Sequence, residues 1–219
     1  MKKGILLCIS LLFISFSAPA AKPFEPDHWS KGLHLLAGGG VNSSVYSASE
    51  ERVDGGLGLN IKTDLLYVLD SNWALEWSAN VKFNQVRSYL LWDTLLTLGV
   101  RRQVPRISPW DLGAPYARFF IGRAPTVLFL NGGQVDQISD PNVSRLHFDG
   151  PVAGFGWGAL KKNTKGQIWF TELSFSIQAL EQEEGVRMDG DVPVVVASTK
   201  MDDNSNIYSF TWTIGILAF

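Results

Sequence analysis

The strongest constraint on the fold is a strict two-residue alternation of apolar and polar side chains. Every odd position from Trp73 to Phe83 is apolar, whereas the even positions between them carry small, polar or charged side chains. The segment Ile168–Ala179 repeats the pattern, with a polar face that includes Glu172 and Gln178. An α-helix needs a period of 3.6 residues, so these segments are predicted to be β-strands with one face in apolar surroundings.

The same period recurs along the chain, and no segment prefers the helical period. Turn-forming and polar stretches divide the sequence into eight expected strands, at 29–41, 53–67, 73–83, 90–100, 116–127, 146–160, 168–179 and 207–219. Four connections are expected on one side of the sheet, namely Asn42–Arg52, Asn84–Tyr89, Leu128–Arg145 and Leu180–Asn206. The apolar residues Val192–Ala197 in the last connection are expected to prolong strands, and an alternative with ten strands has them pair separately.

The beginning of the sequence has the three parts of a secretory signal peptide. Two lysines precede an apolar run from Ile5 to Phe16, and the small residues Ala18 and Ala20 fit a cleavage site. We therefore expect a signal peptide over residues 1–20 and one exported domain over residues 21–219.

Composition narrows the class of protein. A formal net charge of −2 shows no strong bias towards nucleic acid or acidic ligands. Outside the expected signal, no apolar run reaches the roughly 18 residues of a membrane helix, whereas a membrane-spanning strand needs only about ten residues with one lipid-facing side. The only cysteine, Cys8, lies within the expected signal, so the exported part contains no disulfide and no thiol nucleophile.

The polar faces of the expected strands favour a membrane barrel over a soluble one. They carry Ser, Thr, Asn, Gln and Gly with isolated charges, whereas the solvent face of a soluble sheet usually carries more Lys and Glu. The apolar faces carry tryptophans suited to the membrane interface, namely Trp73, Trp77, Trp92, Trp157, Trp169 and Trp212. Lipid offers no hydrogen bonds, so every strand edge must be paired, and only a closed ring achieves that.

The expected signal, the alternating strands and the aromatic ending Ile207–Phe219 together resemble the small eight-stranded outer-membrane β-barrel family. The resemblance covers Trp29–Phe219 and implies an all-β, antiparallel, up-and-down barrel with a filled interior and no cofactor. It implies a monomer in the outer membrane of a Gram-negative bacterium, with both chain ends in the periplasm. The implied partners are outer-membrane lipid, lipopolysaccharide and the barrel-assembly machinery. The resemblance also implies that this machinery recognises Phe219 as its assembly signal.

One feature departs from this family. The apolar face of the last strand falls on even positions, whereas Phe219 is odd. A bulge near Gly215, or a different assignment of inward and outward faces, would bring Phe219 into phase.

Charged side chains on the inward faces predict an internal ion-pair network. These residues are Glu76, Asp93, Arg101, Arg118 and Glu172, together with Lys82. An eight-stranded barrel is only wide enough for side chains to fill it, and buried charges must be paired. We expect a salt-bridge layer that holds the barrel closed, and the alternative is a narrow ion-conducting pore.

Catalysis and metal binding have little support in the sequence. Ser144, His147 and Asp149 are the residues that could serve acyl transfer on lipid A, but their spacing does not bring them together on an extended strand. The histidines are scattered, so no metal site is expected. The expected function is a structural or surface-interaction role without catalytic residues, and the alternatives are a lipid-A-modifying acyl hydrolase or transferase and the narrow pore.

Overall fold

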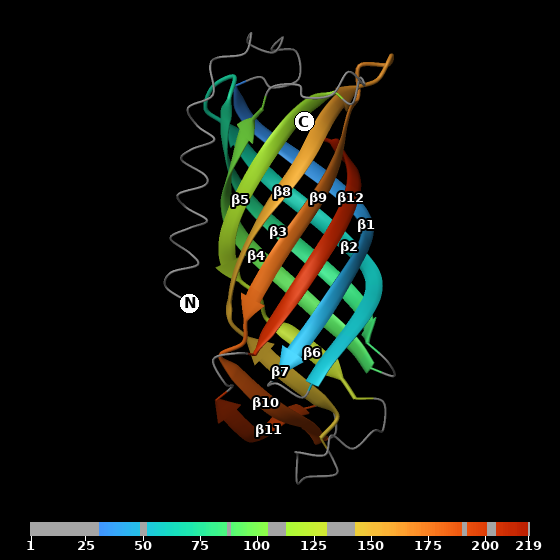
Figure 1. Ribbon diagram of the computed structural model, residues 1–219, viewed down its shortest axis with the longest axis vertical. Helices are drawn as coiled ribbons and strands as arrows, with labels where there is room; N and C mark the ends of the chain where they lie inside the picture. The colour runs from blue at the N-terminus through green and yellow to red at the C-terminus, as the bar shows by residue number, and fades with distance from the viewer. Residues whose placement is uncertain are drawn as a thin grey trace.

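Twelve β-strands account for most of the described chain, and eight of them close into an antiparallel ring (Figure 1). The computed structural model describes residues 31–48, 52–86, 89–104, 113–130, 143–189, 192–200 and 205–218. The strands are β1 Gly32–Ala48, β2 Arg52–Val68, β3 Trp73–Val86, β4 Tyr89–Gln103, β5 Ala114–Arg123, β6 Thr126–Phe129, β7 Arg145–Asp149, β8 Pro151–Lys162, β9 Ile168–Ala179, β10 Gln182–Asp189, β11 Val192–Lys200 and β12 Asn206–Leu217.

The ring runs β1–β2–β3–β4–β5–β8–β9–β12 and closes because β12 pairs with β1. All of these pairs are antiparallel, so the prediction of an eight-stranded up-and-down barrel is confirmed. Every strand of the ring has a partner on both edges, which satisfies the main-chain groups without water. The ten-strand alternative is wrong, because β11 pairs with β10 outside the ring.

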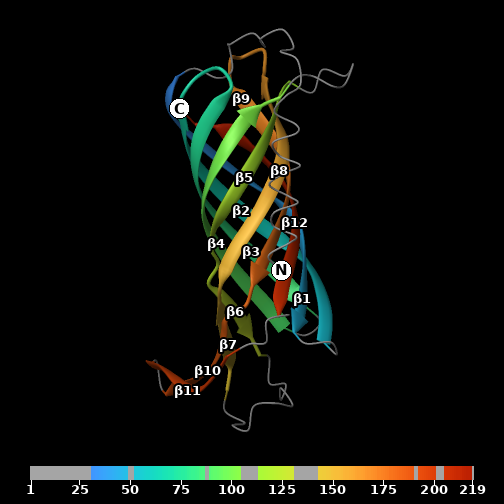
Figure 2. The same ribbon diagram turned by 60° about the vertical axis from the view of Figure 1, so that its left-hand side comes forward.

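The remaining strands continue the sheet beyond the barrel. β4 pairs with β5 through Leu96–Gln103 and with β6 through Leu90–Asp93, so β5 and β6 are successive segments along one neighbour. β6 then pairs with β7, β7 with β10, and β10 with β11. We call β6, β7, β10 and β11 the sheet extension; Figure 2 shows its β10–β11 hairpin leaning away from the barrel.

The extension joins the barrel at three short breaks between consecutive strands, which lie side by side and separate β5 from β6, β7 from β8, and β9 from β10. The breaks lie at Ala124-Pro125, at Gly150 and at Leu180-Glu181. Main-chain hydrogen bonds join them, from the Ala124 amide to the Gly150 carbonyl at 3.1 Å and from the Glu181 amide to the Asp149 carbonyl at 3.0 Å. The structure therefore splits two segments that the sequence pattern predicts as single strands, 116–127 and 146–160, because proline and glycine interrupt the ladder there.

Two predicted connections are largely strand. Residues 42–48 of the expected connection Asn42–Arg52 belong to β1, and residues 42–47 pair with both β2 and β12. The expected connection Leu180–Asn206 contains β10 and β11. The polar side chains of both connections suggest loops. In β1, however, Ser44 faces inward, and its hydroxyl shares a 2.9 Å hydrogen bond with the hydroxyl of Ser209. Ladder hydrogen bonds come from the main chain, so polar side chains do not prevent the strands from continuing.

The two ends of the barrel differ. The short-turn end carries the tight β2–β3 and β8–β9 turns, in which Asp70 and Asn163 accept main-chain amide hydrogen bonds through their side-chain oxygens. Leu36 pairs with Leu217 at this end. The opposite end, which we call the extended end, carries the sheet extension. β12 pairs with β1 without interruption from Asn206 to Leu217, so the predicted bulge near Gly215 is absent from the described strand.

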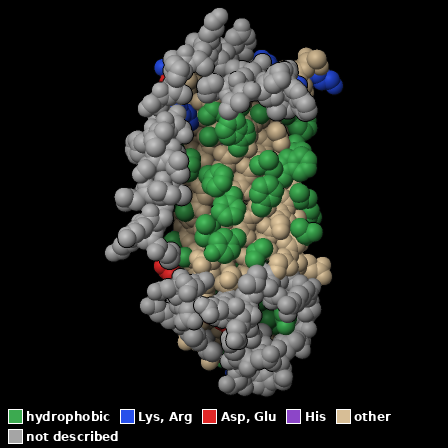
Figure 3. Space-filling view, in the orientation of Figure 1, with side chains coloured by type: hydrophobic (Ala, Val, Ile, Leu, Met, Phe, Trp, Pro, Cys, Tyr) green, Lys and Arg blue, Asp and Glu red, His purple; other side chains and the backbone are tan. Residues whose placement is uncertain are grey.

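Odd-numbered side chains face outward on β1, β2, β3, β5, β8 and β9, and even-numbered ones face outward on β4 and β12. Together they form an apolar exterior (Figure 3). The most exposed large apolar residue, Leu57, is 76% accessible, whereas the inward Asn60, Lys62 and Asp64 of the same strand are at most 2% accessible. Two outward tryptophans have their indole N–H groups satisfied, since Trp212 donates to Thr171 at 3.0 Å and Trp92 donates to Thr94 at 3.1 Å. This exterior suits hydrocarbon rather than water.

Candidate functional site

The barrel interior is filled by side chains in layers. At the short-turn end lies an apolar cluster of Leu36, Leu66, Val68, Ala74, Ala114, Tyr116, Leu160 and Phe170. A second apolar cluster at the extended end contains Leu146, Phe148, Leu180 and Ile207. Polar and charged side chains lie between these clusters, together with a third apolar cluster of Leu95, Ala124 and Val152.

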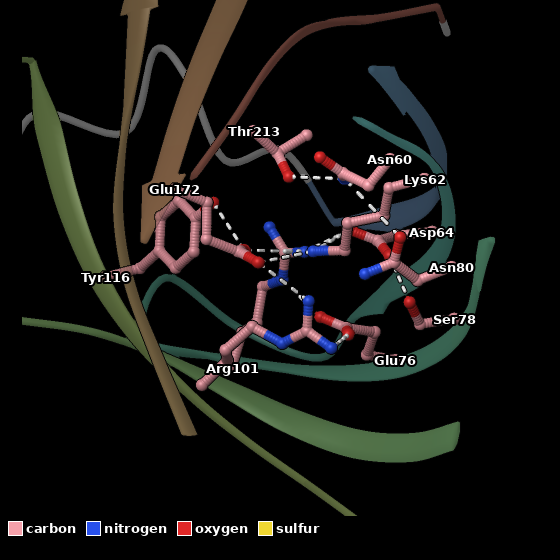
Figure 4. Close-up of polar contacts among 11 residues, drawn as sticks. Asn60, Lys62, Asp64, Glu76, Ser78, Asn80, Arg101, Tyr116, Glu172 and Thr213 are labelled. Carbon is pink, nitrogen blue, oxygen red and sulfur yellow. Dashed lines mark hydrogen bonds and ion pairs between the residues drawn. The ribbon is translucent and has the colours of Figure 1, made fainter. Parts of the chain in front are cut away.

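Six charged side chains form one buried ion-pair cluster directly next to the first apolar layer (Figure 4). They are Lys62, Asp64, Glu76, Arg101, Arg118 and Glu172, each at most 3% accessible. The three cations equal the three carboxylates in number, so the cluster carries no formal net charge. Five strands contribute to it, which ties opposite walls of the barrel together.

Glu172 on β9 is the most connected member of the cluster. One carboxylate oxygen lies 2.5 Å from the Lys62 ammonium and 2.8 Å from the Arg118 guanidinium. The other oxygen accepts a 2.9 Å hydrogen bond from the Tyr116 hydroxyl and lies 3.4 Å from Arg101. Both oxygens are therefore satisfied without water, as burial requires.

Arg101 and Arg118 complete the cluster. Arg101 forms ion pairs with Asp64 and Glu76, and its guanidinium also lies over the Tyr116 ring at 4.6 Å. Arg118 reaches Glu76 at 2.6 Å, while Lys62 pairs with Asp64 at 2.9 Å. Charges from neighbouring strands thus share partners rather than forming separate pairs.

Four of the six inward charges selected from the sequence meet in this cluster, whereas Lys82 and Asp93 lie apart from it. Asp93 is 3.7 Å from the Lys82 ammonium and accepts a 3.0 Å hydrogen bond from the Thr126 hydroxyl. The sequence-based selection missed Lys62 and Asp64. Both lie on even positions opposite the apolar odd positions of 53–67, so the parity rule applied to that strand would have found them.

Glycines on β8 make room for the largest inward side chains. Gly158, Gly156 and Gly154 pair directly with Tyr116, Arg118 and Phe120 on β5. A Cβ atom at Gly158 would lie 2.4 Å from the Tyr116 ring, and one at Gly154 would lie 2.3 Å from the Phe120 ring. Large inward side chains on β5 therefore face glycines on β8, and this leaves room for the ion-pair cluster in the narrow interior.

Comparison with solved structures assigns the fold. No family model and no curated protein matches the sequence. The crystal structure of Neisserial surface protein A (NspA) aligns with a TM-score of 0.53 at 11% identity, covering 85% of this chain and 97% of that protein. The chain therefore has the fold of the small eight-stranded outer-membrane β-barrels.

Two further barrels are similar to this one at lower scores. Ail, the attachment invasion locus protein of Yersinia pestis, aligns with a TM-score of 0.49 at 12% identity, covering 86% of this chain and 99% of Ail. The outer membrane protein AlkL aligns with a TM-score of 0.47 at 14% identity, covering 92% of this chain and 94% of AlkL. In outer-membrane barrels the short turns face the periplasm. The short-turn end therefore corresponds to the periplasmic end of those barrels and the extended end to their extracellular end, and the two ends are called periplasmic and extracellular in this sense.

Among the described residues, no hydrogen bond joins Ser144, His147 and Asp149 to one another. The Ser144 hydroxyl lies 3.4 Å from the Val186 carbonyl oxygen, and Asp149 forms a 3.0 Å ion pair with Arg123. His147 alternates with the buried Leu146 and Phe148 and so lies on the opposite face of β7 from them. The described residues also contain no group of three His, Cys, Asp or Glu side chains suited to hold a metal ion.

The six tryptophans chosen as interfacial all lie on the outward side of the barrel, but at different depths. Trp73 and Trp169 are at the periplasmic ends of β3 and β9, and Trp92 is near the extracellular end of β4. Trp77, Trp157 and Trp212 lie further along their strands. The expected assembly signal, Phe219, and the expected signal peptide lie outside the described residues.

Proposed function

We propose that this barrel is a closed, non-conducting outer-membrane protein that presents its sheet extension to a binding partner outside the cell. The role combines membrane structure with surface interaction. The observation that carries the proposal is the sheet extension, which leads away from the ring and ends in the edge strand β11.

The outer edge of β11 supports binding to another strand. The sheet order ends at β11, so within the described residues no strand covers its second edge. Val192 and Val195 are 62% and 54% accessible, although they lie in an apolar run. An exposed edge with apolar side chains can accept an extended segment of a partner, because main-chain hydrogen bonds supply affinity and side chains supply selectivity.

The filled interior argues against conduction. An ion passing along the axis would have to displace the periplasmic apolar cluster and then separate Glu172 from Lys62, Arg118 and Tyr116. Single-channel recording in planar bilayers tests this point. We expect no steady conductance from the wild type or from Arg118→Ala, and defined channel openings from the wild type would contradict a closed barrel.

Photo-crosslinking on intact cells tests the surface role. A benzoyl-phenylalanine placed at Val195 on β11 is expected to give discrete protein adducts after irradiation. The matched control is the same group at Phe210, which is 52% accessible on the outward face of the ring and is expected to contact lipid only. Equal protein adducts at both positions, or none at Val195, would contradict a binding role for β11.

A further inference from the structure

The sheet extension, which lies beyond the end of the ring in Figures 1 and 2, is attached to the ring unequally at its two sides. β4 is continuous past the junction, because it pairs with β5 through Leu96–Gln103 and with β6 through Leu90–Asp93. The next connections are interrupted at Ala124-Pro125, Gly150 and Leu180-Glu181. One unbroken strand therefore joins ring and extension at one side, and interrupted strands join them elsewhere.

Buried hydrogen bonds fasten the junction beside β4 on the inner face of the sheet. The Gln178 side-chain amide donates to the Ala124 carbonyl oxygen at 2.5 Å, and the Thr126 hydroxyl donates to the Asp93 carboxylate at 3.0 Å. The side chains of Gln178, Thr126 and Asp93 are buried. Breaking such bonds without replacement is costly, so this side of the junction is fixed.

One exposed arginine fastens the interrupted strands on the outer face. The guanidinium of Arg123, the last residue of β5, lies 3.0 Å from the Asp149 carboxylate and 3.1 Å from the Glu181 carboxylate. Asp149 directly precedes the break at Gly150, and Glu181 lies in the break that follows β9. These three side chains, which we call the outer latch, are 61%, 50% and 58% accessible. Exposed ion pairs are individually weak and are screened by salt, so the outer latch can be opened.

Phe148 links the position of the extension to the ring. It lies on β7 next to Asp149 and is buried, and its ring centroid is 5.6 Å from that of Tyr46 on β1. β1 pairs with β2 and β12 but not with β7, so this contact joins ring and extension through side chains alone. A change in the angle of the extension would separate the two rings.

We propose that the junction is a latched hinge, in which the extension turns about β4 and the outer latch holds it in the observed position. Hinges are commonly a few residues at the ends of elements, as the three breaks are here. When Arg123 releases Asp149 and Glu181, β7 and β10 move together because they are paired, and β11 moves with them. The inference concerns how the extension is held and stands whether or not β11 binds a partner.

Pulsed electron paramagnetic resonance on the exported barrel in lipid vesicles tests the hinge. The only cysteine, Cys8, lies within the expected signal, so Val195→Cys on β11 and Phe210→Cys on the ring provide the two spin-label sites. We expect one dominant distance in this labelled parent at low ionic strength. Arg123→Gln adds a second distance and raises its population at least about threefold, and high salt has the same effect on the parent.

The matched control is Lys165→Gln, which removes an exposed cation from the β8–β9 turn at the other end of the barrel. It is expected to leave the distance distribution of the parent unchanged, and heat-modifiable gel migration confirms that each variant is folded. The salt measurement needs no substitution in the outer latch, so it decides the question even where Arg123→Gln does not refold. The inference is overturned if neither salt nor Arg123→Gln alters the distribution, or if Lys165→Gln alters it equally.

Discussion

At the residue scale, the interior depends on how completely each buried charge is paired. Glu172 contacts three cationic side chains and one hydroxyl, and it is 1% accessible. Its importance lies in the balance of the cluster rather than in any single bond. Removing one member leaves its partners buried without compensation, which costs more than the pair contributes when intact.

Glu172→Gln is expected to lower the free energy of unfolding by about 3 kcal/mol. The substitution keeps the size of the side chain but leaves three cations facing two carboxylates. Urea unfolding in lipid vesicles, followed by tryptophan fluorescence, measures the change. The control Glu181→Gln removes an exposed carboxylate paired with Arg123 and is expected to cost less than about 1 kcal/mol. Equal stability of the two variants would show that the buried cluster is not limiting.

At the element scale, the pairing of β5 with β8 decides whether the interior can hold its large side chains. The large side chains of Tyr116, Arg118 and Phe120 face inward on β5, and the facing positions of β8 are glycines. The outward positions of β8 retain Phe155 and Trp157, so the strand is small only on its inner face. The two strands therefore act as one complementary unit.

Gly158→Ala is expected to destabilise the barrel by about 1–3 kcal/mol, because the added methyl group overlaps the Tyr116 ring and disturbs its hydrogen bond to Glu172. The same unfolding measurement serves here. The control Gly55→Ala adds a methyl group on the outside of β2, where the nearest side-chain atom is 3.8 Å away. A Gly158→Ala protein as stable as this control would mean that the interior has spare room.

At the scale of the whole molecule, the ring closes without the β10–β11 hairpin. Within the described residues, β11 pairs with β10 alone, and neither strand belongs to the ring. The barrel supplies the closed edges that a membrane requires, whereas the extension adds surface outside it. Loss of the β10–β11 hairpin should therefore leave the membrane part intact.

Replacing residues 182–200 by a short glycine-serine turn is expected to give a barrel that still refolds. The measurement is gel migration before and after boiling, since a folded barrel migrates differently from its unfolded chain. The variant is expected to keep this heat-dependent shift. A variant that migrates only as unfolded chain would show that the hairpin belongs to the folding unit.

The amino-acid pattern is enough to predict the eight strands of the ring, the direction their side chains face and the closed architecture, but not the sheet extension. Period-two alternation, as in Trp73–Phe83, is a local consequence of the extended backbone, and an apolar outer face forces ring closure in lipid. The same alternation indicated that Glu76, Arg101, Arg118 and Glu172 face inward. These inferences need no knowledge of which strands are neighbours at a given height.

Only the tertiary structure decided which residues meet. Strand tilt and register bring Lys62 and Glu172, 110 residues apart, to 2.5 Å, while Asp93 pairs with Lys82 instead. The strand register also places the β8 glycines opposite the large side chains of β5. Pairing with β2 and β12 extends β1 into a polar segment whose sequence resembles a loop. Polar side chains report little about main-chain pairing, so the sheet extension and the partners of each charge depend on contacts between distant strands.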